Sequence, residues 1–470
     1  MLPKIFRRLF IFLMFVRLFC GEMATASKAD EFRSGSVWAS RADSAQTALE
    51  KYFWNPSEDL FYSNSAGSTT FNYWWQAHAI DVLVDGFMRT EDSSYLDKIS
   101  LLYKGITIRN NGFIDGFYDD MGWMALALLR AFQVTGNSNY LMVVRALWKN
   151  IQTGWDSTLG GGIYWQKSPR MFKNVAANAP ACILACRLYK KFGNGDDLAW
   201  AEKIHSWLKA TLVDSISGTV YDGINTQGTL HKQQYTYNYG TYLGSCLELY
   251  KITKDSSYLN EATRTANVAD SIFAPNGILR DDGTGDGGLF NGIYVRYLAQ
   301  LVLEPDLNYT LRSQYERFLE QNAASLWRLA QEPGTALFNH DWQTSPTGDV
   351  DLSVELSGVM LLEAEALIDR VFDSILHDGA SSPTAYSLAQ NYPNPFNPNT
   401  VIRYTISQSD FVSLKVYNVL GEEVATLVNK EQVPGSYLVI FDASKLPSGI
   451  YLCRLVTSTF CSTRKMSLIK

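Results

Sequence analysis

Apolar side chains between positions 121 and 132 recur with the spacing of one helix face. They occupy positions i, i+3, i+4, i+7, i+8 and i+11. The stripe consists of Met121, Met124, Ala125, Leu128, Leu129 and Phe132. This pattern predicts an amphipathic helix that buries one side.

A short phrase recurs four times and predicts tight links between paired helices. Its copies run over Thr90–Leu96, Thr135–Leu141, Gly193–Leu198 and Thr253–Leu259, the third being the loosest. A short Asp, Asn or Ser side chain can cap the next helix, whose apolar face then begins. Helical hairpins repeated over most of the chain predict a closed helical array.

Helical periodicity ends in the segment 352–372, and the chain then changes character. Residues 384–470 alternate between apolar and polar positions in short runs separated by turns, which predicts strands. Examples are Val401–Thr405, Phe411–Tyr417 and Ile450–Leu455. We therefore expect a helical domain over 27–375, a linker over 376–383 and a β domain over 384–470.

Composition supports a folded, two-part protein and narrows its partners. The chain has 470 residues, 46% of them hydrophobic and 13% aromatic, which is typical of globular proteins. A net charge of −6 without long basic runs argues against nucleic acid. Neither the five His nor the six Cys show metal-ligand spacing, so we expect no metal and no cofactor. We expect a monomer.

Residues 1–26 have the features of a secretory signal peptide. A basic end precedes the apolar run Leu9–Cys20, and Ala24–Ala26 offers a small-residue cleavage site. The mature chain would then start near Ser27. A lipoprotein signal that uses Cys20 is the alternative.

Two neighbouring carboxylates, Asp119 and Asp120, stand at the start of the helix predicted from the apolar stripe. Asp is a preferred N-cap, so capping is one explanation. The other is hydrolysis of a glycoside, which needs two carboxyl groups in different protonation states. Like charges held close together raise one pKa, so such a pair can supply both states. Adjacent Cα atoms lie about 3.8 Å apart, which leaves both the retaining and the inverting separation open.

Several motifs in a shared order resemble glycoside hydrolase family 76, the endo-α-1,6-mannanases, over roughly residues 40–375. They lie at Tyr118–Trp123, Gly161–Trp165, Lys173–Asn174, Ala177–Pro180, Tyr221–Ile224, Tyr237–Gly240 and Phe290–Ile293. The resemblance implies an all-α (α/α)6 toroid with a cleft formed by the longer loops at one end. It also implies α-mannan as the polysaccharide substrate, with Asp119 as nucleophile and Asp120 as acid/base of a retaining mechanism.

Other residues in these motifs and in the aromatic loops are candidate substrate contacts. Sugar rings pack their C–H faces on aromatic rings, although a buried aromatic core would explain many of the same side chains. The candidates are Asp222, Trp75, Trp165, Asn178, Tyr237 and Asn238. The chain departs from the family pattern at Tyr239 and Asn291, which we expect to affect the sugar decoration that is accepted.

The C-terminal segment resembles a second, separate family. Motifs at Asn391–Pro398, Tyr417–Gly421 and Leu446–Tyr451 closely resemble the type A C-terminal sorting domain of bacterial type IX secretion. This implies recognition by that secretion machinery, with export through the periplasm and outer membrane to a secreted or surface-attached state. A small carbohydrate-binding sandwich is the alternative.

Two smaller features stay open at the level of sequence. Asp281–Gly287 resembles a calcium loop but lacks the closing Glu, so a turn that lines the cleft is favoured. Cys453 and Cys461 bracket a predicted hairpin turn and could form a disulfide in an oxidising compartment.

Together these features predict a secreted retaining endo-α-1,6-mannanase. A transglycosylase would share the glycosyl-enzyme intermediate, and a non-catalytic surface glycan-binding protein would share the cleft. A sugar epimerase would ordinarily use histidines as acid and base, and the scattered His residues disfavour it.

Overall fold

The computed structural model describes residues 37–377, 385–391, 394–396 and 398–469. The predicted signal peptide and residues 378–383 of the predicted linker lie outside these described residues. None of the described helices combines the length and the apolar character that a membrane span requires.

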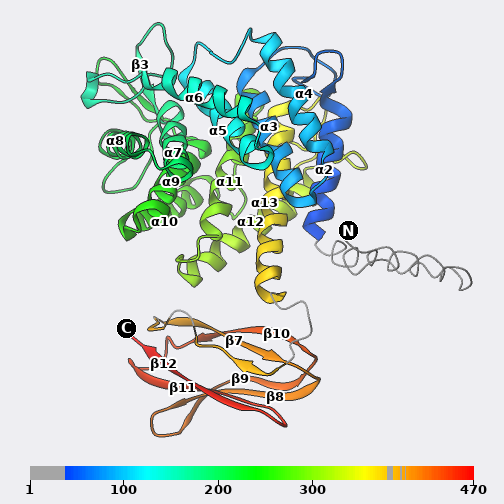
Figure 1. Cartoon of the computed structure of the whole chain (residues 1–470), viewed down its shortest axis with the longest axis vertical. Coiled ribbons are helices and arrows are strands. Elements are labelled where there is room, and N and C mark those ends of the chain that lie inside the picture. Colours follow the sequence, from blue (N-terminus) through cyan, green and yellow to red (C-terminus); the bar gives the residue numbers. More distant parts are fainter. Residues whose placement is uncertain (1–36, 378–384, 392–393, 397, 470) are drawn as a thin grey trace, which may run out of the picture. The chain divides into compact units, whose positions relative to one another are not determined.

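Twelve helices in the described part of the chain alternate between an inner and an outer ring (Figure 1). The inner helices are α3 (Tyr73–Thr90), α5 (Tyr118–Thr135), α7 (Val175–Phe192), α9 (Thr236–Thr253), α11 (Phe290–Val302) and α13 (Leu352–His377). The outer helices are α2 (Val37–Phe53), α4 (Ser94–Arg109), α6 (Ser138–Gln152), α8 (Gly195–Thr211), α10 (Ser256–Phe273) and α12 (Tyr309–Leu329). Each inner helix packs on its neighbours, and α13 packs on α3, which closes the ring. The predicted (α/α)6 toroid is confirmed.

The rings differ because their helices bury different fractions of their surface. The outer helix α6 buries one stripe, at Tyr140, Val144, Leu147, Trp148 and Ile151. The inner helix α9 is buried almost continuously from Thr236 to Tyr250, on every side. A helix that is buried all round must lie between other helices, and a helix with one apolar stripe can cover them.

The four repeated phrases are the inner-to-outer links of the ring. The residue that ends each inner helix is left-handed, with φ of 59° at Glu91, 69° at Gly136, 72° at Gly193 and 56° at Lys254. In the later three links an Asn or Asp side chain then accepts a backbone N–H and caps the outer helix. The sequence repeat thus corresponds to one repeated reversal of chain direction.

Short strands and 3-10 turns lie at the end of the ring where the inner helices start. They are β1 (Trp54–Asn55), β2 (Leu60–Phe61), η1 (Thr158–Gly160), β3 (Phe172–Asn174), β4 (Gly223–Asn225), β5 (Leu230–His231) and η2 (Gly285–Leu289). Strands β3, β4 and β5 form a small antiparallel sheet.

The C-terminal domain consists of two antiparallel sheets around one core. Their orders are β10-β7-β6 and β12-β11-β8-β9. The strands are β6 (Ser387–Leu388), β7 (Asn399–Ile406), β8 (Asp410–Asn418), β9 (Glu423–Gln432), β10 (Gly435–Asp442), β11 (Gly449–Val456) and β12 (Cys461–Leu468). Alternate residues such as Val412, Leu414 and Val416 are fully buried, as expected for half-buried strands. The predicted β sandwich is confirmed.

Cys453 and Cys461 do not form the disulfide that the sequence left open. In the β11–β12 pair Cys453 lies opposite Arg464, and Cys461 lies opposite Val456. The two cysteines are therefore three positions out of register and on opposite faces of the sheet. Cys453 is buried, Cys461 is exposed, and both thiols are free.

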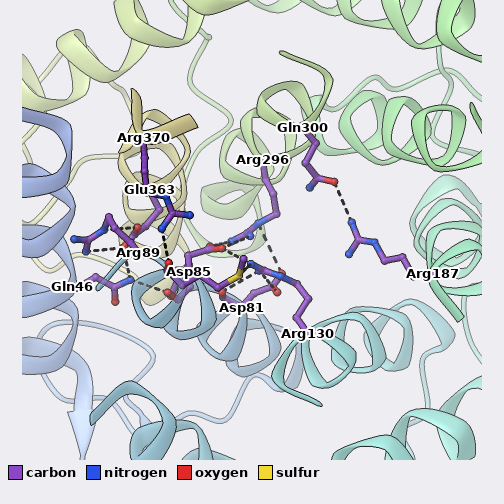
Figure 2. A network of polar contacts seen from close by, with 12 residues as sticks. Gln46, Asp81, Asp85, Arg89, Arg130, Arg187, Arg296, Gln300, Glu363 and Arg370 are labelled. Carbon is purple, nitrogen blue, oxygen red and sulfur yellow. Dashed lines mark hydrogen bonds and ion pairs between the residues drawn. The ribbon is translucent and has the colours of Figure 1, made fainter. Parts of the chain in front are cut away.

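Ion pairs between inner helices join α3 to three others (Figure 2). Arg130 of α5 contacts Asp81 at 2.6 Å and also contacts Asp85, both on α3. Arg296 of α11 contacts Asp85 at 2.7 Å. Arg89 of α3 contacts Glu363 of α13 at 2.8 Å and closes the ring. Each of these side chains is mostly buried.

We predict that Arg89→Met lowers the free energy of unfolding of the helical domain by about 3–5 kcal/mol, because Glu363 would lose its cation while buried. All twelve tryptophans lie between residues 38 and 342, so tryptophan fluorescence during urea unfolding follows this domain selectively. Lys104→Gln removes an exposed pair with Asp59 and should cost at most about 1 kcal/mol. Equal losses in the two variants would contradict a special role for the buried pair.

Candidate functional site

A cavity of about 970 Å³ lies where the inner helices α3, α5, α7, α9 and α11 begin. Its walls combine aromatic rings with carboxylates. The aromatic lining includes Phe71, Trp74, Trp123, Trp165, Tyr237 and Phe290. The carboxylates are Asp115, Asp119, Asp120, Asp222 and Asp286. This combination suits a ligand with both apolar faces and hydroxyl groups.

Helix α5 and the Trp165 indole together position Asp119. Helix α5 starts at Tyr118, so Asp119 lies in its first turn, and its side chain is 9% exposed. The Trp165 indole donates to Asp119 Oδ2 at 2.9 Å. Asp119 Oδ1 has no hydrogen-bond partner among the described residues. One oxygen is thus held by the indole, and the other is buried without a hydrogen bond from the described residues.

Asp120 lies in the same turn and is partly exposed to the cavity. Burial and the charges of Asp119, Asp115 and Asp286 raise its pKa well above the ordinary value. No described cation forms an ion pair with it. This environment therefore favours the protonated form of Asp120.

Burial also raises the pKa of Asp119, to about 7. Backbone N–H groups at the helix start and the Trp165 indole lower this pKa. Because donors favour the charged form, the first proton leaves Asp119 more readily than Asp120. The site can therefore hold one carboxylate beside one carboxylic acid.

The capping explanation does not account for the pair. The N-cap residue of α5 is Phe117, with an extended backbone and no capping side chain. Asp115 instead accepts the Phe117 N–H at 2.8 Å. Both aspartates follow the cap, and their side chains line the cavity.

The loop that carries Trp165 is built around glycines and two buried polar side chains. Gly161 and Gly162 have φ of 139° and 89°, and a Cβ on either would lie within 2.5 Å of a tryptophan ring. Lys173, fully buried, donates to Asp156, Thr158 and Gly161. The Tyr118 N–H donates to Trp165 O at 2.8 Å. The indole is thereby fixed against the start of α5.

Asn178 supports this loop from behind. It is fully buried, accepts the Ile163 N–H at 2.8 Å and donates to Ile163 O at 2.8 Å. Asn178 does not line the cavity. Its predicted substrate contact is replaced by a positioning role, because both of its amide groups are used by the chain.

Asp222 and Tyr237 lie on the cavity wall. The Tyr237 ring stacks on Phe290 with centroids 4.3 Å apart. Asn238 is fully buried and donates to Asp222 Oδ1 at 3.1 Å, so it orients Asp222 from outside the cavity. The predicted contacts of Asp222 and Tyr237 with substrate stay predictions.

Trp75 is 7% exposed and is not part of the cavity lining, whereas its neighbour Trp74 is. Both indoles donate to Asp286 Oδ1, at 3.1 and 3.0 Å. No local sequence signal marks Asp286 or Trp74 as part of the site. The turn that was favoured over a calcium loop does bring Asp286 to the cleft, but only the fold shows which of its carboxylates faces inward.

The two positions that depart from the family pattern are buried. The Asn291 amide donates to Arg280 O at 2.9 Å, and the Tyr239 hydroxyl donates to Gln234 Oε1 at 2.7 Å. Neither side chain lines the cavity. Among the described residues no group of three or more His, Cys, Asp or Glu could hold a metal ion.

Comparisons with known proteins extend over both domains. Residues 37–372 match a family model described as glycosyl hydrolase family 76, and residues 390–470 match one described as a secretion system C-terminal sorting domain. The chain is 28% identical over 267 residues to mannan endo-1,6-alpha-mannosidase DFG5 of Candida albicans, covering 51% of this chain and 59% of that protein. It is 30% identical over 268 residues to DCW1 of Candida glabrata, covering 49% and 59%. The chain thus spans 59% of the length of these curated relatives.

Solved structures show the same relationship. The α-1,6-mannanase GH76A of Salegentibacter sp. HEL1_6 is 40% identical, with a TM-score of 0.69, over 70% of this chain and 99% of that one. An inactive variant of that enzyme, with two consecutive aspartates replaced by asparagine, is in complex with α-1,6-mannotriose. It is 39% identical with the same TM-score and coverage.

We predict that Trp165→Phe raises the pKa of Asp119 by about one unit, because a hydrogen bond to the charged carboxylate is lost. Carboxyl-selective NMR titration of the full chain measures the shift. Trp200→Phe, in a ring cluster of the outer helix α8, should leave the titration unchanged. An unshifted Asp119 in the Trp165 variant would mean that the indole does not set its charge.

Proposed function

Because this chain belongs to glycosyl hydrolase family 76, we propose that it is an endo-acting, retaining α-1,6-mannanase that uses Asp119 and Asp120. The observation that carries the proposal is the pair itself: two carboxyl groups on one helical turn, in one cavity, with environments that separate their protonation states. That separation is what glycoside hydrolysis requires.

The first step forms a glycosyl-enzyme ester. Asp119 attacks the anomeric carbon through a carboxylate oxygen while the bond to the leaving sugar oxygen breaks. Asp120 gives its proton to that oxygen.

The second step releases the product with the original anomeric configuration. Asp120, now a carboxylate, takes a proton from a water molecule whose oxygen attacks the anomeric carbon. The ester bond to Asp119 breaks, and Asp119 returns as a carboxylate. Two displacements at one carbon give net retention, and no cofactor takes part.

The cavity walls suit a mannan chain. Trp74, Trp123 and the stacked Tyr237–Phe290 pair offer rings for sugar C–H faces. Asp222, held by Asn238, offers an acceptor for sugar hydroxyls. The relative with 40% identity is an α-1,6-mannanase, and its inactive variant lacks two consecutive aspartates, which supports both the substrate and the pair.

We also propose that the protein is exported. The C-terminal domain matches a secretion system sorting domain, which supports recognition by type IX machinery, passage across the periplasm and outer membrane, and a secreted or surface-attached enzyme. A surface enzyme would meet polymeric mannan outside the cell, where an endo-acting cleavage is useful.

We predict that Asp119→Ala and Asp120→Ala each lower kcat/KM on unbranched α-1,6-mannan by at least about 10²-fold. On an aryl α-mannobioside with an acidic leaving group, only Asp120→Ala should recover glycosylation, because that leaving group needs no proton. Added azide should then trap the glycosyl group as an α-mannobiosyl azide. Product analysis by NMR measures rate, anomeric configuration and any transfer to a second sugar.

The matched control for both variants is Asp281→Asn, a carboxylate that contacts His340 and the Gly283 N–H and does not line the cavity. It should keep wild-type turnover. Unchanged turnover in Asp119→Ala would remove that residue from the mechanism, and a β-configured product would replace retention by inversion. Mannan binding without any products from the wild-type chain would favour a glycan-binding protein.

The electrostatics of the cleft give a second prediction, on pH. We expect a bell-shaped kcat/KM profile whose acidic limb reports ionisation of Asp119 and whose alkaline limb reports proton loss from Asp120. Asp286→Asn removes a negative charge that raises the pKa of Asp120. That pKa should fall, and the alkaline limb should move to lower pH. Asp281→Asn should leave the limb in place, and a limb unmoved by Asp286→Asn would contradict the assignment.

A further inference from the structure

A second cavity, here named the axial cavity, has a volume of about 380 Å³ and lies among the C-terminal halves of the inner helices. Trp123 lines both this cavity and the cleft. The axial cavity is rich in charge. Its cationic lining consists of Arg130, Arg187, Lys190, Lys191 and Arg296, and its carboxylates are Asp81, Asp85, Glu248 and Glu363.

One part of this charge has a structural explanation. Arg130 and Arg296 are tied to Asp81 and Asp85, as Figure 2 shows. Cations are also favoured near helix C-termini. These groups hold the inner ring together.

The cations at the mouth of the axial cavity exceed what the carboxylates there require. Arg187, Lys190 and Lys191 are spaced i, i+3 and i+4 and so share one face of α7. Arg187 and Lys190 both contact Glu248, at 2.9 and 3.1 Å. Although burial acts to raise it, the charges of Arg187, Lys251 and Lys190 lower the pKa of Glu248 to about 2. One carboxylate thus pairs with two cations, and Lys191 forms no ion pair with a described residue.

Arg187 also has a neutral partner that points toward it across the cavity. Its Nη2 donates to Gln300 Oε1 at 3.2 Å, and both side chains line the axial cavity (Figure 2). The Arg187 side chain is 15% exposed, and that of Lys190 is 42% exposed. Lys190 is therefore open to a solute at the mouth, and Arg187 lies mostly buried behind it.

Deeper in the axial cavity, His78 lacks the partners that a buried imidazole needs. Its residue is 3% exposed, and neither ring nitrogen has a hydrogen-bond partner in the described part of the chain. Burial lowers the pKa of His78 to about 3. A neutral ring has one donor and one acceptor, and a hydroxyl group can satisfy either. Unpaired buried polar atoms are costly and point to an unseen partner.

We propose that the axial cavity binds a small hydroxylated anion, a sugar or polyol that carries one phosphate or carboxylate group. The anionic group lies against Arg187, Lys190 and Lys191 at the mouth. A hydroxyl group reaches His78 at the inner end. The volume is in the range of small-molecule sites, and the site is separate from the cleft because Trp123 stands between them.

The test is isothermal titration calorimetry of the full chain with glucose 6-phosphate and, in parallel, glucuronate. Saturable one-to-one binding of either probe, tighter than that of glucose or inorganic phosphate alone, is expected, and the tighter probe identifies the anionic group. Saturating an α-1,6-linked manno-oligosaccharide should leave the Kd unchanged, because that ligand would occupy the cleft.

Variants distinguish binding in the axial cavity from nonspecific electrostatic attraction to the protein surface. Lys190→Gln combined with Lys191→Gln should weaken binding at least tenfold, and His78→Phe should weaken it while keeping a ring in place. The control combines Lys51→Gln with Lys149→Gln on the outer helices α2 and α6 and should bind like wild type. Absence of saturable binding, competition by the oligosaccharide, or equal weakening in the control would overturn the proposal.

Discussion

The toroid depends on the ion pairs that α3 makes inside the ring. Its Asp81 and Asp85 face Arg130 of α5 and Arg296 of α11, and its Arg89 faces Glu363 of α13. Buried ion pairs gain little net stability, because desolvation offsets their attraction, but a mispaired charge is costly. The pairs therefore select one register for the inner helices. Without that register the starts of α3, α5 and α11 would not meet in one cleft.

The same geometry sets the chemistry of the cleft. Helix N-termini favour negative charge, which explains how five carboxylates can share one cavity. Burial and mutual repulsion act against ionisation, and they act most strongly on Asp120, which has three acidic neighbours. Asp119 differs because the Trp165 indole donates to it, and backbone N–H groups at the start of α5 also lower its pKa. Adjacent residues of one type thus acquire different protonation states from the loops around them.

Local sequence signals predicted much of this structure. They extend over only a few neighbouring residues, so contacts between residues far apart in the sequence could not be predicted from them. The stripe from Met121 to Phe132 and the capped links are short-range features, so helices and their pairing could be predicted. Asp119 and Asp120 stood out because they are adjacent. Asp286 and Trp74 meet across more than two hundred positions, at 3.0 Å, and no local pattern encodes that contact. The motif around Asn178 marks its position without showing whether its side chain faces a ligand or the rest of the chain.

The departures from the family pattern show how a buried change can still reach the cleft. Asn291 does not touch the cavity, yet it donates to the carbonyl of Arg280, at the start of the loop that carries Asp286. Arg280 in turn contacts Asp282 at 3.2 Å. Asp286, farther along the same loop, accepts a hydrogen bond from the Trp74 indole. A different side chain at position 291 would therefore act through the loop, by shifting an aromatic wall and a charge near Asp120 together. One loop thus couples the position of this aromatic wall to the charge beside Asp120.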